Sequence, residues 1–152
     1  MSTSYKITGV AKEIFEGFAF NQTERWEVVV DPDVIGNSPA CRDIAGLPAL
    51  QNWIKAFHEA FDLRIDLIDE FVEGDRGMVT VNLNWKHDCA PFFGIEPIGH
   101  SGTSIESFLL KLTDGKVTSF TVADQSLDLA LYLHAQGMRM PSRVRPPALI
   151  HG

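Results

Sequence analysis

The stretch "TSIESFLLKLTDGKVTSFTVAD", residues 103–124, predicts two antiparallel strands joined by a short turn. Apolar residues fill both halves, and "TDG" at 113–115 supplies the glycine that short hairpin turns favour. Asp124 ends the second apolar run, and a leucine-rich segment follows at once. A carboxylate at the inner end of a buried strand is a helix cap, a surface charge or the acid of a pocket.

Two further strands precede this hairpin. Apolar and polar residues alternate in "LRIDLIDEFV" (63–72) and in "MVTVNLNWK" (78–86), and the turn residues of "EGDRG" separate them. A loop rich in glycine and proline, "HDCAPFFGIEPIGHSG" (87–102), leads on to the hairpin. The sequence therefore predicts a meander of antiparallel strands over its second half.

Helical spacing dominates the first half. Apolar residues recur at helical intervals over 6–20 and, more strongly, over 47–61. Between them, 26–39 predicts a short helix or turn that leads into a strand at 34–37, and a last helix is expected over 126–136. Helices followed by a meander predict an α+β domain with helices on one face of a curved sheet. A nucleotide-binding doubly wound fold is disfavoured because strands and helices do not alternate.

Composition excludes several classes of protein. The 152 residues suit one domain, predicted over 1–138, followed by an extended tail containing Pro and Arg at 139–152. The net charge of −7 disfavours a nucleic-acid partner. No apolar leader follows "MSTSYKITG" and no stretch is long enough to span a membrane, so we expect a cytoplasmic protein without a membrane partner. The two cysteines predict reduced thiols.

The sequence contains no motif typical of a metal site or of a catalytic nucleophile. The five histidines include no pair at i, i+4, and adjacent residues such as "HDC" (87–89) rarely point at one ion. No G-x-S-x-G elbow is present. We therefore expect no metal and no organic cofactor.

Two carboxylates remain as candidate catalytic groups. If "TDG" is a three-residue loop with a bulge at Gly115, Val122 lies opposite Glu106 and Asp124 lies opposite Ser104. Glu106 and Asp124 would then be diagonal neighbours on one face, whereas a two-residue turn would place them on opposite faces. Two carboxylates in an apolar pocket raise one pKa, which gives an acid usable near neutral pH. The alternative for Glu106 is a solvated charge.

Asp124 has a structural alternative as well. "DQSL" precedes the last helix, and Asp is a favoured N-cap residue. Ser126 can cap the same helix, with Asp128 in its first turn. Both readings of Asp124 remain open at this point.

The sequence resembles the SnoaL-like polyketide cyclases of the nuclear-transport-factor-2-like, or ketosteroid-isomerase-like, superfamily. The resemblance covers roughly residues 8–138 and rests on "LLKLTDGKVTSFTVADQSLDLALYLHAQGM", on "FFGIEPIGHSG" and on the helix-strand segment from "WIKAFHEAF" to "VNLNW". It implies a cone, in which a curved antiparallel sheet wraps around a pocket that the N-terminal helices close. It also implies that Asp124 occupies the position of the acid–base aspartate.

The sequence departs from its relatives at several positions. Asn37 in "GNSP" stands where steroid isomerases carry a base Asp, Asp88 stands where many relatives have His, and "EPIG" replaces "PPTG" with His100 just after it. Asn37 cannot take a proton, which argues against steroid isomerase chemistry but leaves its side chain as a possible hydrogen-bond donor to a substrate oxygen. Residues expected to contact substrate are Asn37, His58, Asn82, Asn84, Trp85, Asp88, His100, Phe108 and Phe120.

The resemblance implies a cofactor-independent cyclase or isomerase of specialised metabolism that acts on an apolar, oxygenated small molecule, with Asp124 as the acid–base residue. The expected strand pairing adds Glu106 as the second candidate catalytic residue. An epoxide hydrolase or epoxide-opening cyclase is the alternative enzyme, and a paired acid and base would favour it. A non-catalytic ligand-binding or dimerisation module is the alternative from another class. Relatives bury the outer face of the sheet, so we expect a homodimer or homotetramer.

Overall fold

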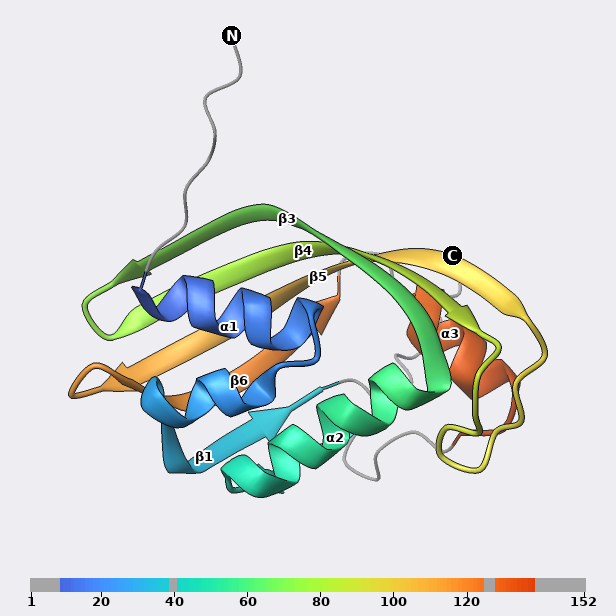
Figure 1. Cartoon of the computed structure of the whole chain (residues 1–152), viewed down its shortest axis with the longest axis horizontal. Helices are drawn as coiled ribbons and strands as arrows, with labels where there is room; N and C mark the ends of the chain where they lie inside the picture. The colour runs from blue at the N-terminus through green and yellow to red at the C-terminus, as the bar shows by residue number, and fades with distance from the viewer. Residues whose placement is uncertain (1–8, 39–40, 125–127, 139–152) are drawn as a thin grey trace, which may run out of the picture.

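Six strands form one curved, open sheet in the order β2-β1-β6-β5-β4-β3, and helices cover its concave inner face (Figure 1). The structure is a computed structural model that describes residues 9–38, 41–124 and 128–138. The elements in chain order are α1 (Gly9–Ala19), the 3-10 helix η1 (Thr23–Val28), β1 (Val30–Asn37), β2 (Ile44–Ala45), α2 (Leu47–Ala60), β3 (Phe61–Glu73), β4 (Arg76–His87), β5 (His100–Thr113), β6 (Lys116–Asp124) and α3 (Asp128–Ala135).

The meander β3-β4-β5-β6 is antiparallel throughout, as the alternating sequence predicts. β1 pairs with β6 in parallel, which the sequence did not indicate, because β2, α2 and the strands β3 to β5 lie between them in the chain and no tight turn joins them. The predicted tail at 139–152 lies outside the described residues. The α+β class, the curved sheet and the helices on one face are confirmed.

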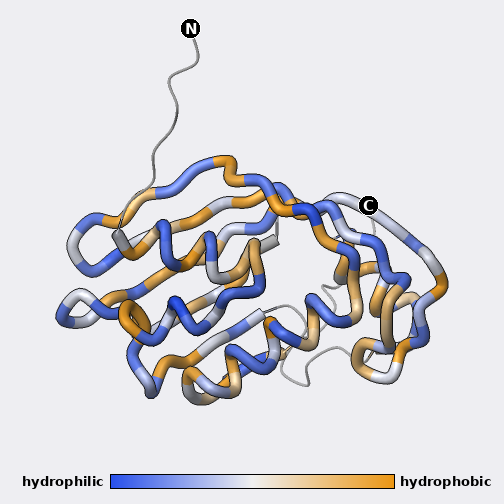
Figure 2. The backbone as a smooth tube through the Cα atoms, in the orientation of Figure 1, coloured by the Kyte–Doolittle hydropathy of each residue, from blue (hydrophilic) through white to orange (hydrophobic). Residues whose placement is uncertain are grey.

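The two long helices form because their apolar residues fall on one side. α1 buries Ile14 and Phe18, and α2 buries Leu50, Ile54 and Phe57. Pro48 occupies the first turn of α2, where its missing N–H costs no hydrogen bond. Apolar and polar residues alternate along both helices (Figure 2), and the buried residues of each helix place its apolar side against the inner face of the sheet.

Aromatic rings tie the helices to the sheet. Phe18 of α1 lies edge-on to Phe108 of β5, with ring centroids 4.8 Å apart, and Phe108 lies 5.0 Å from Phe120 of β6. The Trp26 ring is fully buried at 5.4 Å from Phe120, and its Nε1 donates to the Glu13 carbonyl over 3.0 Å. No described helix is long and apolar enough to cross a membrane.

Candidate functional site

The turn between β5 and β6 has two residues, not the three expected from the sequence. Asp114 (φ 51°) and Gly115 (φ 79°) both have positive φ, the conformation of a type I′ hairpin turn, and Thr113 pairs with Lys116. The register then shifts between Lys111 and Leu112, so the extra residue lies on β6 before Ser119 rather than at Gly115. The predicted three-residue loop is therefore wrong, and the bulge occurs further along the hairpin.

This bulge restores the parity that a two-residue turn alone would have reversed. Glu106 pairs directly with Asp124, and Phe108 pairs with Val122. The predicted pairs were Val122 with Glu106 and Asp124 with Ser104. The observed register differs from them by two residues along β6. Residues directly opposite in an antiparallel pair occupy the same face, with Cβ atoms about 4.5–5.5 Å apart. The register brings the two carboxylate positions closer than the predicted diagonal arrangement; the Asp124 side chain lies outside the described set.

Glu106 lies in a buried, largely apolar floor. Glu106 is only 6% exposed, which rules out the alternative that it is a solvated charge. The neighbours on the same face are Ser104 and Phe108 along β5 and Val81 across on β4, all of them buried. A carboxyl group in such surroundings requires a partner, because burying an isolated charge is costly.

Ser104 connects this floor to α3. Its Oγ accepts hydrogen bonds from Trp85 Nε1 and from the backbone N–H of Leu129, both over 3.3 Å. Leu129 is the second residue of α3, and its N–H is one that an N-cap side chain normally satisfies. Ser104 on β5 therefore accepts the hydrogen bond that an N-cap residue would accept. In addition, α3 begins at Asp128, four residues beyond Asp124. Both observations weaken the interpretation of Asp124 as a helix cap.

A second polar contact holds α3 further along. His87 is fully buried, and its Nε2 lies 2.8 Å from the Ala90 carbonyl, which can only accept. Nε2 therefore carries the hydrogen, and Nδ1 accepts from the Tyr132 hydroxyl over 2.7 Å. Burial raises the pKa of Tyr132, which keeps this hydroxyl protonated. The His100 ring stacks on Tyr132 with centroids 5.0 Å apart.

Among the predicted substrate contacts, the inner face collects Trp85, His100, Phe108 and Phe120. Phe108 and Phe120 are 1% exposed and pack in the core, and Trp85 is 3% exposed. The Trp85 indole lies across Gly102, where a Cβ atom would come within 2.6 Å of the ring. His100 is exposed at the start of β5. These residues share a face with Glu106.

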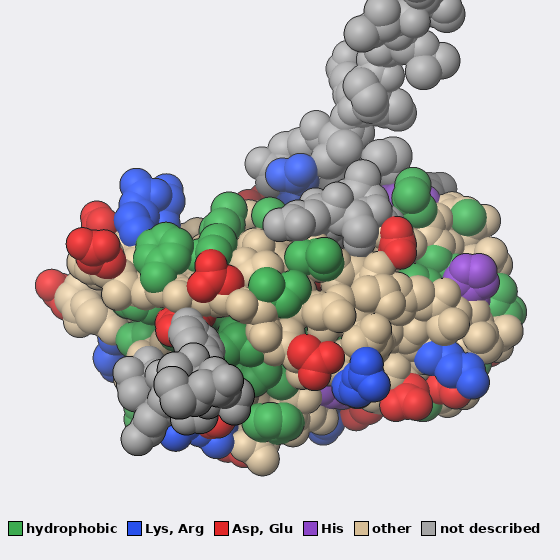
Figure 3. Space-filling model, turned by 90° about the horizontal axis from the view of Figure 1, so that it is seen from above, with side chains coloured by type: hydrophobic (Ala, Val, Ile, Leu, Met, Phe, Trp, Pro, Cys, Tyr) green, Lys and Arg blue, Asp and Glu red, His purple; other side chains and the backbone are tan. Residues whose placement is uncertain are grey.

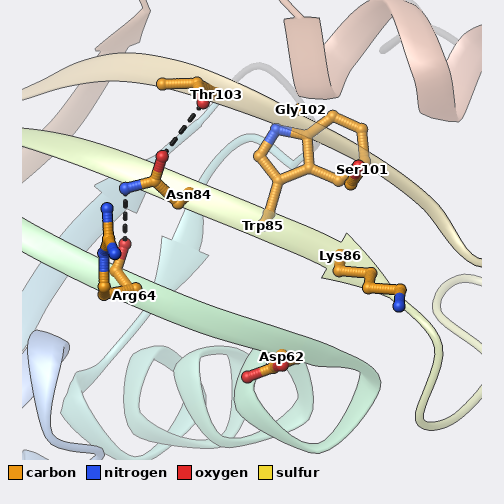
Figure 4. A pocket seen from close by; sticks show the side chains of 8 residues that line it. All are labelled: Asp62, Arg64, Asn84, Trp85, Lys86, Ser101, Gly102 and Thr103. Carbon is orange, nitrogen blue, oxygen red and sulfur yellow. Dashed lines mark hydrogen bonds between the residues drawn. The ribbon is translucent and has the colours of Figure 1, made fainter.

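Asn82 and Asn84 lie on the opposite, outer face of β4. Asn84 Oδ1 accepts from Thr103 Oγ1 over 3.0 Å, and its Nδ2 donates to the Arg64 carbonyl over 3.4 Å (Figure 4). Asn84 lines a hollow of about 390 Å³ on the outer face together with Asp62, Arg64 and Lys86. The sheet separates both asparagines from Glu106.

Asn37, Asp88 and His58 also lie apart from Glu106. Asn37 Oδ1 accepts from the Asp43 N–H over 2.9 Å. Asp88 is in the loop after β4, where it lies 3.6 Å from Lys86 Nζ. His58 Nε2 donates to the Phe18 carbonyl over 2.6 Å, so it joins α2 to the end of α1.

His58 makes the stability of this helix contact depend on pH. Burial lowers the pKa of His58, and the hydrogen bond to Phe18 opposes that shift only in part. The unfolded chain, with a His pKa of about 6.5, therefore binds more protons below that pH than the folded chain does. We expect the melting temperature to fall as the pH falls through about 6.5, and to fall less in His58→Gln, whose amide can still donate to Phe18. Equal slopes in the two proteins would show that His58 does not contribute.

The sequence interpretation missed Ser104 and Tyr132 and assigned His87 no role. Only for Ser104 was a signal available, since it precedes Glu106 by two residues on the same strand and therefore shares its face. Tyr132 and His87 are 45 residues apart in the chain, and the spacing gave no indication that they meet. Within the described ranges, no group of three or more His, Cys, Asp or Glu residues is arranged to hold a metal ion.

Solved structures share this fold at low sequence identity. A candidate SnoaL-like polyketide cyclase from Jannaschia sp. CCS1 is 18% identical, with 91% of this chain and 99% of that chain covered and a TM-score of 0.69. IdmH, a candidate polyketide cyclase from Streptomyces antibioticus, is 14% identical (81% and 94% covered, TM-score 0.62). AclR, a candidate hydroxylase from Streptomyces galilaeus, is 18% identical (82% and 92% covered, TM-score 0.63).

A comparison with curated proteins finds no match to the sequence. The family model described as SnoaL-like polyketide cyclase matches residues 11–130, which run from α1 through all six strands into α3. The chain belongs to the SnoaL-like polyketide cyclase family.

Proposed function

We propose that the protein is a cofactor-independent cyclase or isomerase in which Asp124 and Glu106 act together as an acid–base pair. The observation that carries the proposal is the direct pairing of these two positions across β5 and β6, next to a buried apolar floor. Two carboxyl groups that lie side by side in an apolar site share one proton, because both cannot ionise at low cost. Such a pair can accept one proton and supply another near neutral pH.

The reaction proposed needs only proton transfers and one carbon–carbon bond. The Asp124 carboxylate takes a proton from a carbon next to a carbonyl group, and the C–H electron pair moves to form an enolate. The enolate carbon then attacks a second carbonyl of the same molecule, and the resulting alkoxide receives a proton from the pair. Simple isomerisation omits the attack and returns the proton to another carbon. Neither route consumes an oxidant or a reductant.

The exchange of carbon-bound hydrogen tests this chemistry without the true substrate. 2-Tetralone is a bicyclic apolar ketone whose C1 protons lie between the ring and the carbonyl group. In D₂O, we expect the protein to accelerate replacement of these protons by deuterium above the buffer rate, as followed by proton NMR. Exchange at the buffer rate with saturating protein would count against proton abstraction by this site.

The same pairing favours epoxide opening as a second candidate function. One carboxylic acid would protonate the epoxide oxygen while the other carboxylate activates the attacking hydroxyl or water. Styrene oxide serves as the probe, and formation of styrene glycol above background would support this alternative. The buried positions of Glu106 and Ser104 speak against a purely non-catalytic module, for which polar residues were expected to face solvent or a partner.

We also propose that the outer face of the sheet forms a homo-oligomer interface. Phe71 and Leu109 are 48% and 45% exposed on this face and line a hollow of about 340 Å³. Figure 3 shows hydrophobic side chains at the surface among acidic ones when the molecule is seen from above. Sedimentation should give at least twice the chain mass of 16.9 kDa, and Leu109→Lys should lower it. A wild-type mass near 16.9 kDa at micromolar concentration would refute this interface.

A further inference from the structure

A two-residue turn in the loop between β4 and β5 holds an aromatic residue in a conformation that favours glycine. Phe92 and Ile95 exchange two backbone hydrogen bonds, each over 3.0 Å, and Phe93 and Gly94 form the turn between them. Both turn residues have positive φ, 51° at Phe93 and 76° at Gly94, as in a type I′ turn. A bulky side chain is strained in this region. The turn is therefore held against a local cost at Phe93.

The turn packs against α2 and the start of β3 through Phe92. The Phe92 ring is 5% exposed, and its centroid lies 5.7 Å from that of Phe57 on α2 and 5.3 Å from that of Phe61 on β3. It also lies edge-on to Trp53 of α2 at 6.2 Å. Ile95, at the other end of the turn, is buried as well. The turn thus covers part of an aromatic cluster at the place where α2 leads into the sheet (Figure 1).

Trp53 carries a second cost at the same contact. Its indole Nε1 is buried and has no hydrogen-bond partner in the part of the chain that the structure describes. The other tryptophans are satisfied, since Trp26 Nε1 donates to the Glu13 carbonyl and Trp85 Nε1 donates to Ser104 Oγ. A buried donor without an acceptor loses the hydrogen bond that water would supply. Water reaches Trp53 Nε1 only when a group that covers it moves away.

We propose that residues 92–95 form a flap with two states, the closed state of this structure and an open state in which Phe92 and Ile95 leave the aromatic cluster. Opening exposes these two apolar side chains, which favours the closed state. The same movement lets water reach Trp53 Nε1 and releases Phe93 from its strained conformation, which favours the open state. Because these effects oppose each other, the open state is a minor population of the native protein.

Opening the flap exposes an aromatic surface beside α2, the helix that closes the inner face of the sheet. An apolar ring can enter over Phe57 and Phe61 once Phe92 has left them. The flap is therefore an entrance for the apolar ligand of the proposed function. This role rests on the proposed function, because it requires a ligand on the inner face, whereas the existence of the two states does not.

Hydrogen exchange of single N–H groups, followed by NMR, tests the two states. The Ile95 amide reports on the turn, and Trp53 Nε1–H reports on α2. In the wild type, their protection factors should agree within about threefold, since one opening exposes both groups, and should lie below those of Trp26 and Trp85 Nε1–H. Phe93→Asn should slow exchange at both groups by about tenfold, because asparagine tolerates the left-handed conformation. Exchange at Trp26 and Trp85 should stay unchanged.

Slower exchange at Ile95 alone would refute the flap, because it would show that the turn does not cover Trp53. Phe92→Ala supplies the opposite test, since it removes the ring that holds the flap closed. It should speed exchange at Trp53 Nε1–H by about tenfold or more and leave Trp26 and Trp85 unchanged. Equal acceleration at all three indole groups would indicate general destabilisation and would also refute the flap.

The association rate of naphthalene tests the entrance separately from catalysis. Naphthalene has no carbonyl group, so its binding does not depend on the acid–base pair. Because a ligand that enters through the open state associates in proportion to the open population, Phe93→Asn should lower this rate by the same factor by which it slows exchange at Trp53 Nε1–H. An unchanged rate, or no binding of naphthalene by the wild type, would contradict the entrance. A lowered rate in a protein that fails to exchange 2-tetralone would leave the entrance standing and the proposed function refuted.

Discussion

Asp124→Asn is expected to keep the fold and to slow deuterium exchange into 2-tetralone by about 10²–10⁴-fold, the usual share of acid–base catalysis. Asparagine has nearly the same shape but cannot accept a proton from carbon. The strand pairing at this position, Glu106 with Asp124, involves the backbone and is unaffected by the substitution. Exchange rates and melting temperatures of both proteins should be measured on the same preparations.

The rival explanation for Asp124 predicts a different pattern. If Asp124 only caps α3, Asp124→Ala should cost about 0.5–2 kcal/mol of stability and Asp124→Asn almost nothing, because asparagine caps equally well. Exchange would then remain near the wild-type rate in a folded Asp124→Asn protein. The structure already weakens this explanation, since α3 starts at Asp128 and Ser104 Oγ accepts the Leu129 N–H.

Glu106→Ala is expected to slow the exchange by about 10–10²-fold, because a positioned partner of the catalytic base is lost. Glu106 is buried and lies directly opposite Asp124, so alanine leaves the second carboxylate without its neighbour. Glu106→Gln should recover most of the rate, since its amide can still donate a hydrogen bond to a carboxylate. Val79→Ala, at a buried apolar position of the same face two residues before Val81, controls for loss of packing.

The two Glu106 variants also separate the candidate functions. In ring closure or isomerisation through Asp124, glutamine is tolerated much better than alanine. In epoxide opening, the proton must come from an ionisable acid, so glutamine and alanine should abolish styrene oxide opening equally. A Glu106→Ala protein with unchanged exchange and unchanged epoxide opening would remove Glu106 from the site.

The sequence predicted most of the fold because its strongest patterns are local. Alternation in 63–72 and 78–86 and helical spacing in 47–61 each follow from one buried face, and the structure contains β3, β4 and α2 at those places. The parallel pairing of β1 with β6 was not predictable in this way. Val30 and Val117 are far apart in the chain, and no short turn connects them.

The candidate site was less predictable, because single residues decide which face a side chain occupies. The turn at Asp114 and Gly115 and the extra residue before Ser119 each reverse the parity of β6, and only their combination places Asp124 opposite Glu106. Composition alone does not reveal a bulge. The outer-face positions of Asn82 and Asn84, by contrast, follow from the alternation with Val81 and Leu83, which are buried.

A crystal structure of the protein with 2-tetralone bound tests the central claim most directly, since that claim is that the paired positions on β5 and β6 face a ligand. We predict a ligand between the helices and the inner face, with the Asp124 carboxylate beside the Glu106 carboxyl group and in contact with the ligand. A ligand bound only in the outer hollow near Asn84, or an Asp124 carboxylate turned toward the first turn of α3, would contradict the account.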